Sequence, residues 1–150
     1  MESSSSVEIE CPIEEVFDYT NNNVAEWSIV VVEEEIIHET REGVGTTFRV
    51  VTEDRGKRMD FDGVVTHFEP PTASSIEMVG QFFDITADYL FEDLGGRTRV
   101  TQISNVRGKG FFKVVFALFG WMMKKSSCDA LEKELSQLKR LCEERHQAQA

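Results

Sequence analysis

The sequence has few cysteines, few prolines and comparatively few basic residues. It contains three cysteines and three prolines, and its 16 lysines and arginines are outnumbered by 27 acidic residues, for a formal net charge of −11. Three cysteines do not make a disulfide framework. An acidic chain lacks the basic footprint of a nucleic-acid-binding protein and the charge for stable docking on anionic membranes. We therefore expect no nucleic-acid partner and no stable membrane binding.

Long apolar runs and targeting signals are also missing. The most apolar stretch, residues 111–123, is shorter than the roughly 20 residues that a transmembrane helix needs. Residues 1–6 lack the apolar core of a secretory signal, so we expect a reduced, cytoplasmic protein. A chain of 150 residues is long enough to bury one core. We predict one domain over residues 5–145, with disordered ends at 1–4 and 146–150, and leave the oligomeric state open.

The histidines and cysteines show no metal-binding spacing. His38, His67 and His146 lack a companion pattern such as H-E-x-x-H, so we expect neither a metal nor another cofactor. Cys11 stands before Pro12, at a predicted helix start where the helix dipole would lower the pKa of a thiol. We interpret Cys11 instead as a buried structural cysteine.

Two different apolar patterns follow one another near the C-terminus. Residues 111–123 are apolar on nearly every side, and residues 128–142 form an amphipathic helix with one buried stripe. The stripe consists of Cys128, Leu131, Leu135, Leu138 and Cys142. We expect one long helix whose apolar first half is covered by the rest of the chain. Because a mid-helix glycine costs about 1 kcal/mol relative to alanine, Gly120 predicts a bend or a close approach to that cover.

The middle of the chain has the two-residue period of strands, interrupted by glycine and proline turn signals. We predict a strand over residues 5–11 and two short helices, starting at Pro12 and near Asn23. Six more strands are predicted over residues 29–38, 45–54, 57–69, 73–80, 82–93 and 97–107. The short connections favour antiparallel pairing, because parallel pairs need crossovers of about a dozen residues. The fold class is therefore α+β.

Apolar and acidic residues alternate along these strands. A sheet with one covered face shows this alternation, so the apolar side predicts the surface that curls around the C-terminal helix. Its residues include Phe48, Val50, Met59, Phe61, Met78, Phe83, Ile85 and Tyr89. Most acidic residues fall on the other side.

Several segments together resemble the START-like (SRPBCC) superfamily, most closely its polyketide cyclase/dehydrase branch. They are residues 7–19, Trp27, Gly45-Thr46, Glu69-Pro70-Pro71, residues 96–101 and the helix ending at residues 135–139. The resemblance covers residues 5–144. It implies a helix-grip fold, in which a curved seven-stranded antiparallel sheet wraps around a long C-terminal helix with a hydrophobic cavity between them. Members bind lipids, sterols, polyketides or other apolar molecules, and only some catalyse reactions.

The resemblance makes the apolar face a candidate ligand site, although the same residues would also suit a filled core. Tyr89, Gln102 and His67 are the polar groups that would orient a ligand. We expect the ligand between Met59 and Phe61 of the sheet and Phe116 and Trp121 of the helix. The full predicted set is Trp27, Phe48, Val50, Met59, Phe61, His67, Met78, Phe83, Ile85, Tyr89, Gln102, Phe116, Trp121 and Met122.

Three functions follow from this interpretation. The first is cofactor-free binding of a hydrophobic or amphipathic small molecule that is lipid-, sterol- or polyketide-like. The second is a polyketide cyclase or dehydratase, which needs an inward acid/base pair; it ranks lower because acidic residues fall mostly outward, and we assign no catalytic residue. The third is an interaction module in which residues 111–123 contact a membrane or a partner, a possibility suggested by the superfamily's members associated with carbon monoxide dehydrogenase.

Overall fold

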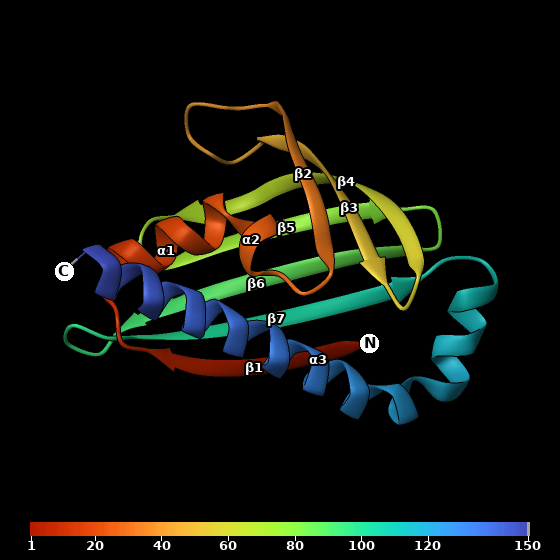
Figure 1. Ribbon diagram of the computed structural model, residues 1–150. Helices are drawn as coiled ribbons and strands as arrows, with labels where there is room; N and C mark the ends of the chain where they lie inside the picture. Colours follow the sequence, from red (N-terminus) through yellow and green to blue (C-terminus); the bar gives the residue numbers. More distant parts are fainter. Residues whose placement is uncertain (150) are drawn as a thin grey trace.

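The computed structural model describes residues 1–149 and contains seven strands and three helices, shown in Figure 1. In chain order these are β1 (Glu2–Ile9), α1 (Ile13–Asn22), α2 (Val24–Trp27), β2 (Val31–His38), β3 (Thr47–Asp54), β4 (Lys57–Glu69), β5 (Ala73–Gly80), β6 (Phe83–Asp93), β7 (Thr98–Gly108) and α3 (Phe111–Gln149). The predicted elements after residue 12 are all present, with ends that differ by no more than a few residues.

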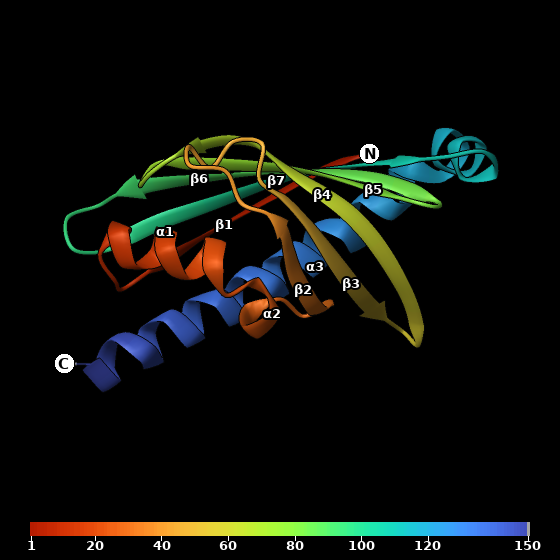
Figure 2. The ribbon, with the colours of Figure 1, turned by 90° about the horizontal axis from the view of Figure 1, so that it is seen from above.

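All seven strands form one antiparallel sheet in the order β1-β7-β6-β5-β4-β3-β2. The sheet curves, and α1, α2 and the second half of the long helix α3 all lie on one side of it (Figure 2). The predicted α+β helix-grip fold is confirmed. β1 and β2 are the two edge strands of the sheet. β1, the first strand in the sequence, pairs with β7, the last.

The main core lies where the second half of α3 meets α1, β6 and β7. Leu131, Leu135, Leu138 and Cys142 are the buried residues of α3, so the predicted stripe from 131 onward is confirmed. The helix packs chiefly on β1 and β7 rather than across the middle of the sheet. Helix α1 begins directly after Pro12, and its first-turn carboxylates favour that end of the helix dipole.

Most of the first half of α3 is not covered by the sheet, so the prediction of a covered first half is wrong. Phe111 is 75% exposed, Leu118 61% and Trp121 77%. Figures 1 and 2 show this segment beyond the end of the sheet. The cause is length, because a 39-residue helix spans about 58 Å at 1.5 Å per residue, whereas the 11-residue β7 spans about 36 Å.

Gly120 does not mark a close approach to another element. A Cβ at this position would meet no heavy atom within 4 Å, so that part of the prediction is wrong. The helix does bend between its first turns and the half that packs on β1 (Figure 1). Among the described residues, no helix has a segment both long enough and apolar enough to cross a membrane.

The segments predicted to be disordered, residues 1–4 and 146–150, largely fall within regular elements of the described residues. β1 begins at Glu2, which pairs with Asn105 of β7, so residues 2–4 belong to the sheet. The amino group of Met1 also donates to the Val106 carbonyl oxygen at 2.9 Å. At the other end α3 continues through Gln149, and Ala150 lies outside the described residues.

Candidate functional site

The face of the sheet that packs against α3, here called the inner face, is defined by the strand register. Directly opposed residues of antiparallel strands point to the same side. Tyr89 of β6 is opposed by Ser74 of β5 and by Gln102 of β7. Because Tyr89 belongs to the same core cluster as Leu135 of α3, this row of three residues lies on the inner face.

Six predicted ligand residues do come together on β3, β4, β5 and β6. The buried members are Phe48, Val50 and Phe61. Half-buried apolar side chains surround them, including Met59, Met78 and Ile85. We call these six residues the β3/β4 patch. Its members are apolar, and it forms a core cluster separate from the one that contains Leu135.

A second group consists of Trp27 of α2 and the row formed by Ser74, Tyr89 and Gln102. The ring of Trp27 meets the ring of Tyr89 edge-on, with centroids 6.3 Å apart and planes at 87°. Trp27 Nε1 donates to the Thr20 carbonyl oxygen at 3.0 Å, which fixes the indole. Trp27, Tyr89 and Gln102 are all buried.

Phe83 and Phe116 form a third group near the start of α3. Their rings stack with centroids 5.6 Å apart and planes at 13°. Phe116 therefore packs on β6. Trp121 and Met122 are 77% and 59% exposed, so the expected site between Phe61 and Trp121 is wrong.

His67 does not face the ligand region as expected. The β4–β5 ladder shifts between Val65 and His67. Because of this shift, His67 is opposed by Ser75 of β5, which is opposed in turn by Asp88 of β6. These residues lie on the outer face, the face of the sheet that points away from α3. The His67 side chain is 54% exposed and lies 3.3 Å from a carboxylate oxygen of Glu69.

Glu134 of α3 is an inward carboxyl group that does not belong to the predicted site residues. It accepts a hydrogen bond from Ser28 Oγ at 3.1 Å. Burial raises the pKa of Glu134 to about 7, although the hydrogen bond from Ser28 acts to lower this pKa. Burial, and then the negative charge of Glu134, raise the pKa of Tyr89. The helical period was a usable signal, because position 134 lies one turn from both Leu131 and Leu138 of the stripe.

Glu34 of β2 is a second inward carboxyl group. It is opposed by Val50 of the β3/β4 patch, so it points to the inner face. Burial raises the pKa of Glu34. Its orientation was not predictable from simple alternation, because the β2–β3 ladder shifts between Val31 and Glu33.

The inner face contains buried polar atoms that have no hydrogen-bond partner among the described residues. They are Ser74 Oγ, Gln102 Oε1 and, beside Met59 on the patch, Thr52 Oγ1. About nine in ten buried polar groups in proteins are hydrogen-bonded. This face can therefore still bind the oxygen or hydroxyl group of another molecule.

Two pockets lie near the helices. One of about 240 Å³ lies between α1 and the end of α3 and is lined by Cys11, Glu15, Asp18, Tyr19, Cys142, Arg145, His146 and Gln149. The other, of about 280 Å³, lies beside α2 and β2 and is lined by Asn21, Asn22, Asn23, Val24, Ala25, Glu26, Glu34 and Ile36. Neither is lined by a predicted ligand residue, so the cavity expected beside Phe61 is neither of these two.

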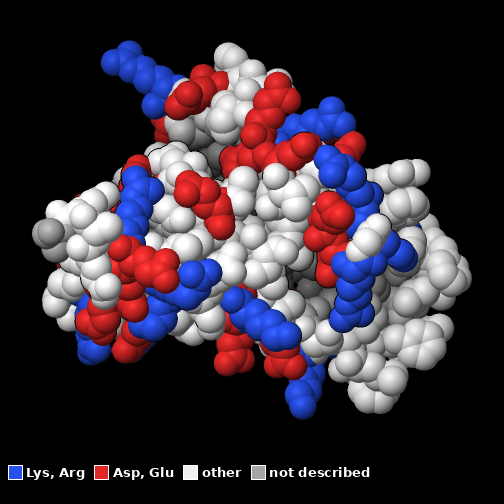
Figure 3. All heavy atoms as spheres, viewed as in Figure 1, with Lys and Arg blue, Asp and Glu red and all other residues white. Residues whose placement is uncertain are grey.

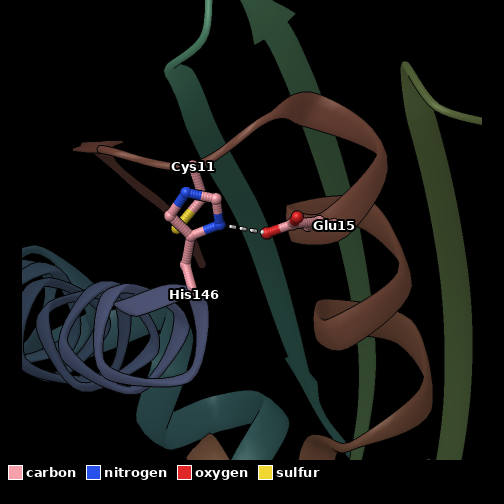
Figure 4. A group of neighbouring side chains, drawn as sticks. All are labelled: Cys11, Glu15 and His146. Atoms are coloured by element: carbon pink, nitrogen blue, oxygen red, sulfur yellow. Dashed lines mark hydrogen bonds and ion pairs between the residues drawn. The ribbon is translucent and has the colours of Figure 1, made fainter. Parts of the chain in front are cut away.

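The smaller pocket brings a thiol, a carboxylate and an imidazole together, as Figure 4 shows. These groups belong to Cys11, Glu15 and His146, and their ligand atoms all lie within 4.8 Å of one another. Burial, followed by the negative charge of Glu15, raises the pKa of the Cys11 thiol to about 11. The helix dipole was expected to lower the pKa of this thiol, and burial outweighs that effect. The interpretation of Cys11 as a buried cysteine is confirmed.

Solved structures with the same fold are distant in sequence. A START superfamily protein from Mycobacterium smegmatis superposes with a TM-score of 0.81 at 18% identity, covering 95% of this chain and 97% of that one. A protein from Thermus thermophilus gives 0.77 at 19% identity, covering 95% and 97%. Zhui aromatase/cyclase from a Streptomyces species gives 0.73 at 11% identity, covering 93% and 94%.

No curated protein matches this sequence. The model of one protein family, described as polyketide cyclase / dehydrase and lipid transport, matches residues 1–143. That match extends from the first strand through the buried half of α3 and includes every element that builds the inner face. The chain belongs to the polyketide cyclase / dehydrase and lipid transport family.

Proposed function

We propose that the protein binds an amphipathic small molecule, lipid-, sterol- or polyketide-like, between the inner face of the sheet and α3. One observation carries this proposal. Ser74 Oγ and Gln102 Oε1, on either side of Tyr89, are buried without hydrogen-bond partners among the described residues. A ligand hydroxyl group, which both donates and accepts, would satisfy them, and burial of a polar group is costly unless it is so paired.

The apolar part of the ligand would lie on the β3/β4 patch. Burial of apolar surface contributes about 25 cal/mol per Å², so binding needs no charged anchor. Flexible methionines such as Met59 and Met78 suit a wall that adapts to its ligand. The family description, which includes lipid transport, supports the same class of ligand.

The proposed binding residues are a reduced form of the predicted set. Trp27, Tyr89 and Gln102 form the polar end, the β3/β4 patch forms the apolar wall, and Phe83 with Phe116 closes the far end. His67, Trp121 and Met122 are left out because their side chains are exposed. The cytoplasmic location expected from the sequence remains part of this proposal.

Native mass spectrometry of the freshly purified protein tests the proposal, followed by titration with fatty acids, sterols and flat polyphenols. A retained or added ligand is expected, and Gln102→Leu should weaken hydroxylated ligands by about tenfold, the loss of about one hydrogen bond. Thr86→Val, on the outer face of β6, is the matched control and should leave affinity unchanged. Absence of any bound molecule in both assays would contradict the proposal.

Catalysis by a cyclase or dehydratase is a second candidate, favoured by Glu134. A general acid/base works best with a pKa near the operating pH, and burial raises the pKa of Glu134 to about 7. Its test is turnover of a linear poly-β-ketone substrate mimic by the wild type and by Glu134→Gln. Turnover that survives the substitution unchanged would remove Glu134 from this role.

The exposed first half of α3 favours a third candidate, an interaction module with a protein partner. Phe111, Val114, Leu118, Phe119, Trp121 and Met122 are all exposed. Figure 3 shows this end of the molecule as largely free of charged side chains. Large exposed apolar surfaces mark interaction sites, and the net charge of −11 disfavours an anionic membrane. Cosedimentation with anionic vesicles should therefore leave the protein in the supernatant, and pelleting would assign the surface to lipid.

A further inference from the structure

Three side chains of metal-binding types meet where α1 and the end of α3 close on the sheet. Cys11 precedes α1, Glu15 lies in its first turn, and His146 lies in the last turn of α3. Their ligand atoms lie within 4.8 Å of one another, and Figure 4 shows the imidazole between the thiol and the carboxylate. This site shares no residue with the proposed ligand site on the inner face.

The backbone around Cys11 is held firmly by neighbouring elements. Its thiol donates to the carbonyl oxygen of Cys142 at 3.3 Å. Its own carbonyl oxygen accepts a hydrogen bond from Thr98 Oγ1 at 2.8 Å, and its amide donates to the carbonyl oxygen of Ile9 at 2.9 Å. The sulfur is thereby fixed beside α3, while the more exposed Glu15 and His146 can adjust their rotamers.

The other two donors already contact one another. Glu15 Oε2 and His146 Nδ1 are 2.8 Å apart. In a tetrahedral zinc site, bonds of about 2.0–2.3 Å place neighbouring donors roughly 3.4–3.6 Å apart. Cys11, Glu15 and His146 therefore reach that geometry through shifts of about 1 Å in side chains rather than through movement of a helix.

The chemistry of the donors selects the class of metal. Sulfur, imidazole nitrogen and one carboxylate oxygen suit Zn²⁺ and similar transition metals, whereas Ca²⁺ and Mg²⁺ prefer sites made of oxygen. Three protein ligands leave a fourth position open, as in zinc sites that bind a water or another molecule. Here that position would face the pocket of about 240 Å³ lined by the same three residues.

We propose that Cys11, Glu15 and His146 bind one Zn²⁺-type transition-metal ion whose fourth position opens into this pocket. On binding, the thiol proton passes to solvent and a metal–sulfur bond replaces it, with no change of oxidation state. The ion joins the β1–α1 connection to the end of α3, segments separated by more than 130 positions. It therefore stabilises the closure of α3 on the sheet.

Titration of the chelator-treated full-length protein with Zn²⁺ alone tests this site by calorimetry and thermal melting. We expect one ion per chain and a higher melting temperature with Zn²⁺. His146→Ala and Glu15→Gln, which change partly exposed side chains, should each lower affinity at least tenfold. Cys128→Ser and His38→Ala are matched controls outside the site and should leave affinity unchanged.

Cobalt gives a readout that a purely structural role for Cys11 would not produce. Co²⁺ bound through a thiolate has a sulfur-to-metal charge-transfer band, which should be present in the wild type and lost in Cys11→Ser. Circular dichroism checks that each variant is folded. Failure of the wild type to bind Zn²⁺, or binding that survives His146→Ala and Glu15→Gln and disappears in Cys128→Ser, would overturn the proposal.

Discussion

The ring of Phe48 lies directly over Gly63, its opposed residue on β4. A Cβ built on Gly63 would come within 2.3 Å of the Phe48 ring. Phe61 covers Gly80 of β5 in the same manner, at 2.6 Å. Two glycines of the inner face thus leave room for the aromatic rings of the β3/β4 patch, and the absence of their side chains shapes the proposed ligand wall.

Gly63→Ala should therefore destabilise the protein by about 1–3 kcal/mol, since overpacking forces the Phe48 ring or the strands to move. Gly120→Ala is the matched control. A Cβ there meets nothing, and alanine has the higher helix propensity, so the free energy of unfolding should rise by up to about 1 kcal/mol. Urea unfolding measures both. Equal effects of the two substitutions would contradict the packing described for Phe48.

The two halves of α3 should respond differently to truncation of a leucine. Leu135 is 0% exposed and Leu118 is 61% exposed. Leu135→Ala should cost about 2–5 kcal/mol in the free energy of unfolding, whereas Leu118→Ala should change it by no more than about 0.5 kcal/mol. Chemical denaturation compares them. A large loss for Leu118→Ala would show that the first half of α3 packs in a core.

Glu134 should make stability depend on pH in a defined direction. Its pKa is about 7 in the folded protein against 4.5 for the ordinary group. Between these pH values the folded state binds the proton that the unfolded state has released, so this contribution is complete below about pH 4.5 and is lost as pH rises to about 7. The stability of Glu134→Gln relative to the wild type should therefore increase by about 3 kcal/mol from pH 4 to pH 8.

Urea unfolding across that range provides the measurement. Glu132→Gln, an exposed position on the same helix, is the control and should show no such trend. A stability difference between Glu134→Gln and the wild type that stays constant with pH would mean that Glu134 is solvated.

The two tryptophans should differ in their access to solvent quenchers. Trp121 is 77% exposed and Trp27 is 1% exposed. Acrylamide should quench the emission of Trp121 strongly, and Trp121→Phe should leave a residual emission that resists quenching. Unchanged quenching in Trp121→Phe would show that Trp27 is the accessible indole. The same signal reports a partner on α3, which should protect Trp121.

The local pattern of residues determined the elements. Alternation between apolar and charged side chains marked β4 and β6, and glycine and proline marked their ends, because both signals act over a few neighbouring residues. The stripe from Leu131 to Cys142 likewise identified the buried half of α3. The resemblance to the START-like superfamily added the arrangement of these elements.

Only the tertiary structure decided which side chains meet. A ladder shift after Val65 turned His67 outward, and the length of α3 carried Trp121 past the end of the sheet. Glu134 faces Ser28, and His146 faces Glu15, across separations of more than 100 residues. Local periodicity indicates which side of a helix or strand is apolar. Which residue of another element lies against that side depends on register shifts, on the overhang of α3 and on long-range packing, and all three depend on the whole folded chain.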